Sequence, residues 1–210
     1  MKQLLLLFAF VLLMNISLPA QDQGKIHMGF RAGYNYGLSV FKAPGKLGSN
    51  PVHGGYAGVQ LKIPFDNHLF FAPQMDVNYR GMTLKTPVAN ELSKVTEFQV
   101  RVAPLLQIDF AQPDQNTFFL QFGPSIGFGL KGNQTKQDAS NNPVQSQLRY
   151  GYQSYGRYDV NAHIGFGYET AEGFRFMAEY IHGIGNMINT EFGPVLKYRN
   201  ISLGIGFRLR

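Results

Sequence analysis

The sequence predicts an all-β protein, namely a closed transmembrane antiparallel up-and-down β-barrel of about eight strands. Three observations predict this fold class: apolar and polar residues alternate in eight separate segments, long and short connections alternate between them, and the chain starts with an export signal. The chain has 18 Phe, 11 Tyr and 24 Gly among 210 residues, yet its mean hydropathy is −0.14. Strands that are apolar on one face only produce this mixture.

Residues 1–20 are predicted to be a cleaved signal peptide. Lys2 precedes an unbroken apolar run, Leu4–Leu13, which is too short to cross a bilayer as a helix, and Ala20 ends a plausible cleavage site. An uncleaved membrane anchor is the alternative. We expect residues 21–210 to form one barrel domain, stabilised without disulfides because the chain has no cysteine. The same absence argues against a lipoprotein anchor and against thiol catalysis.

The first predicted strand, Ile26–Ser39, shows the alternation most clearly: its even positions are apolar or aromatic, and its odd positions are polar or glycine. In a strand these two sets face opposite sides. The same pattern recurs at residues 55–63, 69–80, 97–110, 118–131, 157–169, 174–180 and 200–209. Pro73, Pro104 and Pro124 fall inside predicted strands, where each removes a backbone donor. We expect a local bulge near each of them.

The connections between these segments predict the topology. Short connections follow the second, fourth and sixth segments, at residues 64–68, 111–117 and 170–173. Long connections follow the first, third, fifth and seventh, at residues 40–54, 81–94, 132–156 and 183–197. Bacterial outer-membrane barrels have short periplasmic turns and long outer loops. The layout therefore predicts an outer-membrane protein with both termini in the periplasm, closed by an even number of strands.

Charged residues recur on the predicted inward face. The set expected to form a structural network in the lumen is Arg31, Lys62, Asp76, Glu97, Arg101, Lys131, Asp159, Glu169, Arg175, Glu179 and Arg208, with Arg80, Asp109 and Arg157 on the same face. Eight strands enclose a lumen just wide enough to be filled by side chains, so a near-balanced charge predicts interior ion pairs. A substrate path or a narrow conductance is the alternative interpretation.

The tight turn at residues 170–173 also predicts a register. It sets Glu169 opposite Arg175, Gly165 opposite Glu179, and His163 opposite Ile181, so that every lumen residue faces a lumen residue. A looser turn before Phe118 allows Glu97 to face Lys131. Paired opposite charges of this kind are what a plugged interior needs.

No catalytic, metal-binding or cofactor-binding residues are predicted. His163 could form a catalytic-looking set with Asp159, Glu179 and Ser125, but no spacing demands it, and a hydrogen-bonded lumen histidine is the simpler interpretation. The other histidines lack metal-ligand spacing. Gly165 and Gly167 open no helix, so they do not form a nucleotide-binding loop, and small residues that relieve crowding in the lumen explain them better.

The charge of the chain narrows the choice of partners. Removal of the signal peptide takes away Lys2 and leaves a net charge of +5 from the +6 of the whole chain. Nucleic acid is not an expected partner, because the basic residues are scattered and the chain is exported. Attraction to anionic lipid or sugar fits better, so outer-membrane lipid is the expected partner, and protein partners in the same membrane remain open.

Several short segments carry a family resemblance. They are Pro73–Met75 with Arg80–Gly81, Ala103–Leu106, Phe122–Pro124, Gly165–Glu169, Tyr180 with Gly183, and Asn200–Phe207. In order and spacing they resemble the PorT-like outer-membrane barrel proteins of Bacteroidetes over most of the mature chain. The chain departs from the family at Val102, where Glu is frequent, at Glu179, where Arg is frequent, and at its end, Leu209-Arg210, where an aromatic residue is usual. The resemblance implies an outer-membrane barrel, and PorT itself is a component of type IX protein secretion.

Three functions are compatible with these observations. The first is a non-enzymatic scaffold or binding protein that acts through its extracellular loops, without an open pore. The longest loop, with Tyr150, Tyr152 and Tyr155, could contact sugar or protein, or could equally be a mobile polar loop. The second is an accessory subunit of an outer-membrane secretion or uptake machine. The third is a lipid-modifying barrel enzyme, which a lipid-facing polar triad would favour; the sequence shows none.

Overall fold

The protein is described from a computed structural model, which describes residues 25–42, 49–85, 92–112, 115–137, 142–151, 155–187 and 195–209. The predicted signal peptide, residues 1–20, lies outside the described residues. The strands are β1 (His27–Lys42), β2 (Ser49–Asn50), β3 (Val52–Pro64), β4 (Leu69–Lys85), β5 (Leu92–Asp109), β6 (Thr117–Gln137), β7 (Pro143–Gln147), β8 (Tyr158–Glu169), β9 (Phe174–Gly183) and β10 (Val195–Arg208). Among the described residues, no helix has the length and apolar character needed to cross a membrane.

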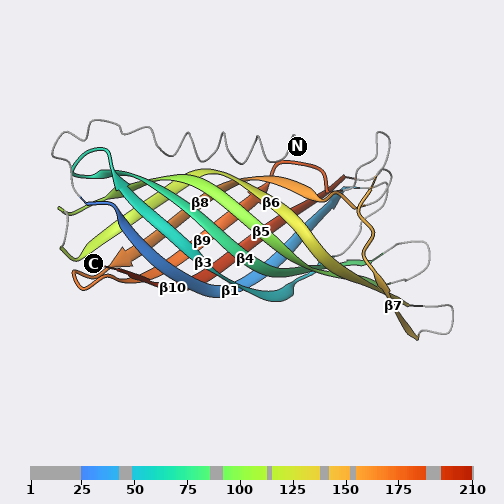
Figure 1. Ribbon diagram of the computed structural model, residues 1–210. Helices are drawn as coiled ribbons and strands as arrows, with labels where there is room; N and C mark the ends of the chain where they lie inside the picture. Colours follow the sequence, from blue (N-terminus) through green and yellow to red (C-terminus); the bar gives the residue numbers. More distant parts are fainter. Residues whose placement is uncertain are drawn as a thin grey trace, which may run out of the picture.

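Eight of these strands close into an antiparallel barrel (Figure 1). The ring closes because β1 pairs with both β10 and β3, while β4 pairs with both β3 and β5. Closure leaves none of the eight strands with an open edge inside the ring, as a membrane-spanning sheet requires. The predicted fold class is therefore confirmed. The two short strands lie outside the ring, with β2 paired to β4 and β7 paired to β6.

The two ends of the barrel differ. At one, which we call the short-turn end, tight turns join β3 to β4 and β8 to β9; in the second of these, Thr170 N donates to Phe174 O at 2.8 Å. Gly173 completes this turn with a φ of +100°, which favours glycine. Leu209 N donates to Met28 O, so both ends of the described chain lie here. The other end carries the longer connections, and we call it the long-connection end.

The outward face carries two rows of aromatic residues. The upper girdle, toward the long-connection end, comprises Tyr34, Tyr36, Tyr79, Phe98, Phe128, Tyr158 and Tyr180; the lower girdle comprises Phe65, Phe71, Phe118, Phe166, Tyr168, Phe174 and Phe207. Phe118 and Phe128 on β6 lie ~33 Å apart along the strand, which a tilt of ~40° reduces to ~25 Å. This is the height of the apolar band of an outer-membrane barrel.

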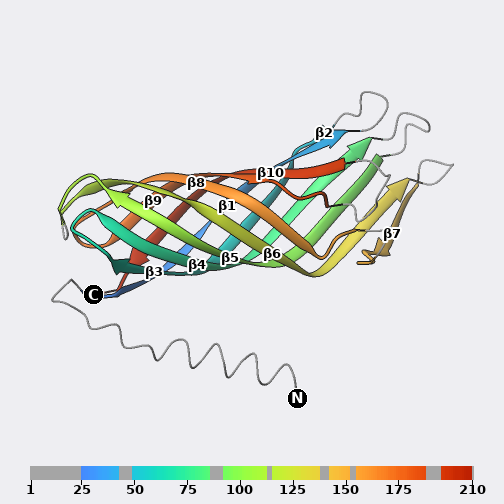
Figure 2. The same ribbon diagram turned by 90° about the horizontal axis from the view of Figure 1, so that it is seen from above.

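The strands are longer than predicted, and the connections at the long-connection end are shorter. Within the predicted loop at residues 81–94, residues 81–85 belong to β4 and residues 92–94 belong to β5, and within the predicted loop at 132–156 β6 continues to Gln137 and pairs with β7. As a result, β4, β5, β6 and β7 project beyond the rest of the barrel (Figure 2). The hydrophobic alternation stops earlier than the backbone pairing because strands beyond the membrane meet water rather than lipid on their outer face.

The bulges predicted at the prolines are wrong. Pro73 stands opposite Pro104 in an unbroken β4–β5 register, and the β5–β6 register is the same on both sides of Pro124. The pairing pauses beside the prolines on the β3 and β6 sides and then resumes, so the sheet loses individual hydrogen bonds without a shift. The irregularity lies instead at Leu130, where Phe98 pairs with Lys131 and Gln99 pairs with Gly129. Leu130 is the extra residue of a β-bulge.

Candidate functional site

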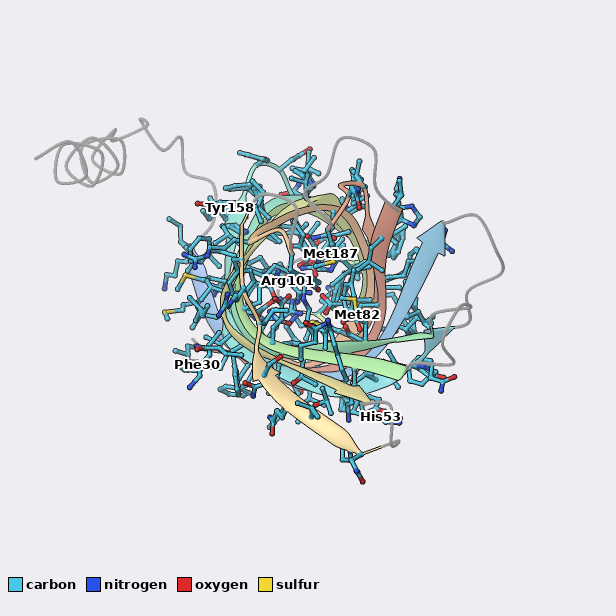
Figure 3. The ribbon with its side chains drawn as sticks, turned by 90° about the vertical axis from the view of Figure 1, so that its right-hand side faces the viewer. Phe30, His53, Met82, Arg101, Tyr158 and Met187 are labelled. Atoms are coloured by element: carbon cyan, nitrogen blue, oxygen red, sulfur yellow. The ribbon has the colours of Figure 1, made fainter. Side chains whose placement is uncertain are left out.

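The barrel interior is filled by charged side chains. Six cations and six anions are at most 6% exposed: Arg31, Lys62, Arg80, Arg101, Arg175 and Arg208, with Asp76, Glu97, Asp109, Asp159, Glu169 and Glu179. Seen from the long-connection end, Arg101 lies near the centre of the ring, whereas Phe30, His53 and Tyr158 lie outside it (Figure 3). The twelve charges form three layers along the barrel axis.

The middle layer is organised by Arg31 on β1. Its guanidinium donates to Glu179 Oε2 at 2.5 Å, and its Nε lies 3.1 Å from Asp76 Oδ1. Arg101 donates to the other Asp76 oxygen at 2.8 Å. The guanidinium carbon of Arg31 also lies 4.7 Å from the centre of the Tyr56 ring. Two cations and two anions thus neutralise one another across strands β1, β4, β5 and β9.

The lower layer lies near the short-turn end and is organised by Glu169. One of its oxygens lies 2.8 Å from Arg208 Nε and 3.4 Å from Lys62 Nζ, and the other lies 3.3 Å from Arg175 Nε. Lys62 donates to Asp109 at 2.6 Å. The layer therefore holds three cations and two anions. Its excess of one positive charge is balanced by the layer on the far side of the neutral middle layer, where Arg80 lies between Glu97 and Asp159.

The upper layer contains one cation between two anions. Arg80 donates through Nε to Glu97 at 2.6 Å and through Nη1 to Asp159, whose other oxygen accepts from Gln99 at 2.7 Å. The Tyr150 hydroxyl donates to Glu97 at 3.0 Å. Burial, together with the Glu97 carboxylate, raises the pKa of the Tyr150 phenol, so the hydroxyl stays a donor. Across the three layers the interior charge sums to zero.

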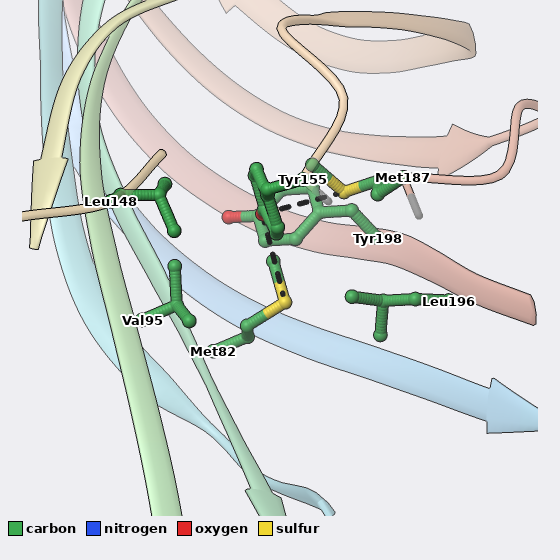
Figure 4. Packing of buried hydrophobic residues seen from close by; sticks show 7 residues of the cluster. All are labelled: Met82, Val95, Leu148, Tyr155, Met187, Leu196 and Tyr198. Atoms are coloured by element: carbon green, nitrogen blue, oxygen red, sulfur yellow. Dashed lines mark hydrogen bonds between the residues drawn. The ribbon is translucent and has the colours of Figure 1, made fainter. Parts of the chain in front are cut away.

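An apolar cluster closes the lumen above these layers (Figure 4). It consists of Met82, Val95, Leu148, Tyr155, Met187, Leu196 and Tyr198, and we call it the apolar plug. The Tyr155 hydroxyl lies 3.7 Å from both Met82 Sδ and Met187 Sδ and donates to them. Leu148 and Tyr155 follow β7 and Met187 follows β9, so two connections fold over the mouth of the barrel. Sequence reasoning missed this plug, although isolated apolar residues in polar loops are its signal.

A group of amides fills the space between the middle and upper layers. Asn35 Oδ1 accepts from Ser202 at 2.7 Å and from Asn200 at 3.0 Å, and Asn35 donates to Asn78 at 3.4 Å. An interior cavity beside them has a volume of about 10 Å³. This space suits about one water molecule. The interior in this region is therefore packed by side chains and does not form a wide passage.

The structure brings together ten of the eleven predicted lumen residues, and Lys131 is the exception. Lys131 is exposed on the outer face, because the bulge at Leu130 turns two consecutive residues outward. The predicted Glu97–Lys131 pair is therefore wrong, and Arg80 takes the place of the lysine. Arg157 is also exposed, with its guanidinium carbon 5.0 Å from the centre of the Tyr150 ring.

The predicted register of β8 and β9 is confirmed at each position. Glu169 pairs with Arg175, Gly165 with Glu179, and His163 with Ile181. A tight turn between two strands fixes the register in which they pair. The glycines of β8 relieve crowding as expected. A Cβ on Gly167 would overlap the ring of Phe119, which itself packs under Arg175 with 4.3 Å between the guanidinium carbon and the ring centre.

The catalytic-looking set is not brought together at an accessible site. His163 Nε2 lies 3.1 Å from Glu179 Oε1, which belongs to the middle layer, while Asp159 belongs to the upper layer with Arg80. His163 is 2% exposed and Ser125 is fully buried. A nucleophile needs both its base and a substrate within reach. Within the described residues, no three His, Asp or Glu side chains form a metal-binding group.

Comparison with known structures agrees with this architecture. Ail, the attachment invasion locus protein of Yersinia pestis, has a TM-score of 0.51 at 13% identity, covering 89% of this chain and 100% of that one. OprG from Pseudomonas aeruginosa has a TM-score of 0.48 at 9% identity (90% and 97% covered), and Neisserial surface protein A has 0.44 at 10% (89% and 100% covered). At such identities the likeness to Ail shows the fold alone. A search of curated protein sequences finds no match.

A family model covers most of the chain. The model of the outer membrane protein beta-barrel domain matches residues 19–189, which include all of the strands except β10. The match agrees with the closed eight-stranded ring and with the two aromatic girdles on its outer face. The chain therefore belongs to the family of outer membrane protein beta-barrel domains and is a small eight-stranded barrel of the outer membrane.

Proposed function

We propose that this barrel is a non-enzymatic, non-conducting binding or scaffold protein that acts through its long-connection end. The observation that carries the proposal is a contrast between its two parts. The lumen holds twelve buried, mutually neutralising charges and is closed by the apolar plug. The strands β4 to β7, by contrast, project beyond the girdle and present polar side chains. A protruding sheet on a filled barrel is suited to binding a partner rather than to transporting solutes through the lumen.

The strand β7 supplies a specific recognition feature. All five of its side chains are exposed, and in the described part of the chain it pairs with β6 alone. Leu148 N donates to Gly132 O, so the alternation of an antiparallel ladder directs the backbone groups of Gln145 and Gln147 away from β6. An extended segment of a partner protein could add to this edge as a further strand.

The proposal places the long-connection end outside the cell and both termini in the periplasm. Because the chain contains no cysteine, single substitutions can report this directly. Ser146→Cys on β7 should react with a membrane-impermeant maleimide on intact cells, whereas Glu172→Cys in a short turn should react only after lysis. Both side chains are exposed in the structure, so the pair is matched in accessibility. The reverse labelling pattern would invert the proposed orientation.

Partner binding is tested by crosslinking in intact cells. A photo-crosslinking residue at Gln145 should give a discrete adduct, and one at Glu172 should not give the same adduct. Replacing residues 135–145 by a short Gly-Ser turn should abolish the adduct from a probe at Ser146, while heat-modifiable gel mobility shows that the barrel still folds. Folded barrels with no adduct at Gln145, Ser146 or Gln147 would contradict binding through this edge.

An accessory role in a secretion or uptake machine, as the PorT-like resemblance implies, is the second candidate. The edge of β7 supports it as well, because it could join the barrel to a neighbouring subunit. Stoichiometric co-purification from native membranes with one fixed complex would favour this candidate over a free-standing binding protein. A lipid-modifying enzyme is the least supported function, since His163 and Ser125 face the lumen and are buried.

A further inference from the structure

The excess positive charge of the protein lies outside the lumen. The six buried cations and six buried anions cancel, so the net charge of +6 belongs to the remainder of the chain. Seven basic side chains at the long-connection end are exposed or half-buried: Lys94, Lys131, Lys136, Arg149, Arg157, Lys197 and Arg199. Within the described residues, the acidic side chains outside the lumen are Asp66 and Glu172, and both lie in short turns at the opposite end.

Three of these cations lie near one another, Lys94 on β5, Lys131 on β6 and Arg157 directly before β8. Lys131 stands opposite Phe98, and Lys94 stands opposite Thr135, with Thr96 and Asn133 paired between them. We call the group of Lys94, Lys131 and Arg157 the basic patch. The carbonyl of Arg157 accepts from Gly129 N at 2.8 Å, which places Arg157, just before β8, beside a residue two positions from Lys131.

The basic patch lies at the level of lipid headgroups. Lys131 shares its row with Phe98 of the upper girdle, and aromatic girdles mark the boundary of the apolar band. Lys94 lies four residues farther along β5, which corresponds to ~10 Å above the girdle for a strand tilted by ~40°. Headgroup regions extend roughly 5–8 Å beyond the hydrocarbon on each side of a bilayer, and a lysine side chain can bend toward them.

Other features of the patch suit phosphate. The rings of Phe128 and Tyr150 lie 5.5 and 5.0 Å from the Arg157 guanidinium carbon, which holds a planar donor group at the membrane surface. Thr96, Asn133 and Thr135 add hydroxyl and amide donors between the lysines. No carboxylate among the described residues lies on this outer surface to compete for the cations.

We propose that the basic patch binds the phosphate groups of lipopolysaccharide in the outer leaflet. Because Lys131 stands opposite Phe98, four residues from Lys94, a lipid with two separate phosphates fits the two lysines better than a lipid with one. The inference rests on the proposed orientation, with the long-connection end outside. The patch thus fixes the barrel to the particular lipid that surrounds its outer half, while the projecting β6–β7 hairpin remains available for a protein partner.

The test uses the refolded full-length mature barrel in neutral detergent and bisphosphorylated lipid A as the probe. The double variant Lys94→Gln/Lys131→Gln should bind lipid A about 30-fold more weakly than the unchanged protein, since each headgroup-level cation contributes about five-fold. The control Lys25→Gln/Lys136→Gln removes the same charge at exposed positions outside the patch and should bind within about two-fold of the unchanged protein. Heat-modifiable mobility shows that each variant is folded.

Two further arms identify the ligand chemistry. Lipid A stripped of its phosphates should lose most of its affinity for the unchanged protein, and phosphatidylglycerol should bind more weakly than bisphosphorylated lipid A. Equal weakening by the two double variants would reduce the effect to net charge and overturn the patch. Equal binding of dephosphorylated lipid A would exclude phosphate as the ligand, and equal binding of phosphatidylglycerol would exclude lipopolysaccharide as its particular source. None of these outcomes depends on partner binding at β7.

Discussion

At the scale of single residues, each buried charge is stable only through its partners on other strands. A lone charge in a lumen that is closed to water is costly, and a pair recovers that cost only when hydrogen bonds satisfy both members. Asp76 illustrates this, because one carboxylate serves both Arg31 and Arg101. Removing such a shared anion leaves two cations facing each other across the middle layer.

The first prediction follows from Asp76. Asp76→Asn should lower the free energy of unfolding by ~3–5 kcal/mol, the usual cost of leaving buried charges unpaired. Asp66→Asn makes the same chemical change in an exposed short turn and should stay within ~0.5 kcal/mol of the unchanged protein. Urea titration of the barrel in lipid vesicles, followed by gel mobility without boiling, measures both. Similar urea midpoints for the two variants would contradict the conclusion that Asp76 neutralises both Arg31 and Arg101.

The second prediction concerns the lipid-facing surface. Ile164 lies near the middle of the apolar band and is 49% exposed on the outer face. Ile164→Arg should therefore cost ~2–4 kcal/mol in a bilayer. Val144→Arg introduces the same side chain on β7, beyond the girdle, where the residue is 52% exposed, and should cost less than ~0.5 kcal/mol. Equal effects of the two substitutions in lipid vesicles would argue against the assigned membrane position.

At the scale of strands, register decides which residues meet. The bulge at Leu130 moves Lys131 from the lumen to the membrane surface, and it leaves Gly132 opposite Glu97. Because Leu130 is an extra residue, the lumen-facing positions of β6 are odd-numbered before the bulge, as at Gly129, and even-numbered after it, as at Gly132. A strand with this feature resists simple period-two analysis, since the alternation changes phase in its middle.

The third prediction compares two single-residue deletions in β6. Deleting Leu130 removes the unpaired residue and leaves Gly129, Lys131 and Gly132 facing inward, outward and inward, so the barrel should still fold. Deleting Phe128 removes a residue within the regular register and should turn part of β6 to the wrong face. Folding yield in vesicles measures the difference, and we expect the deletion of Phe128 to be the more damaging. Equal yields would show that Leu130 is not a true bulge.

The elements that could be predicted from sequence are those in contact with both lipid and lumen. There, apolar and polar neighbours alternate, as in β8 and β9, and a tight turn then fixes the pairing of Glu169 with Arg175. The ion pairs between distant strands, such as Arg31 with Glu179, depend on the tilt and stagger of the closed ring. Sequence alternation carries no information about stagger, so these pairs and the apolar plug required the structure.

At the scale of the whole molecule, the barrel is a filled cylinder whose strands β4 to β7 protrude at one end. Lower, middle and upper charge layers occupy the lumen, and the apolar plug closes the long-connection end. Partner binding and solute transport require different interiors in a small barrel, because a rigid support needs a packed lumen and a channel needs an empty one. The lumen of this barrel is packed, as a support for binding requires.

The fourth prediction follows from the filled lumen. The purified barrel should show little or no ion conductance in planar bilayers over a range of salt concentrations. The variant Tyr155→Ala, which opens the plug but keeps the charge layers, should also show no ion conductance, because Arg80, Glu97 and Asp159 still block the lumen. A stable, large conductance from the unchanged protein would move a transport function ahead of the proposed binding function.

The neutral interior also has a consequence for how the protein is made. A β-sheet that closes one residue out of register turns its inward side chains outward, and a cation so exposed would cost ~2–4 kcal/mol at the bilayer centre and ~0–1 kcal/mol near its surfaces. Six lumen cations distributed over six strands make almost every slipped arrangement unfavourable. The charge layers can thus be regarded as a proofreading device: they penalise incorrectly assembled barrels while contributing no net charge to the correctly assembled one.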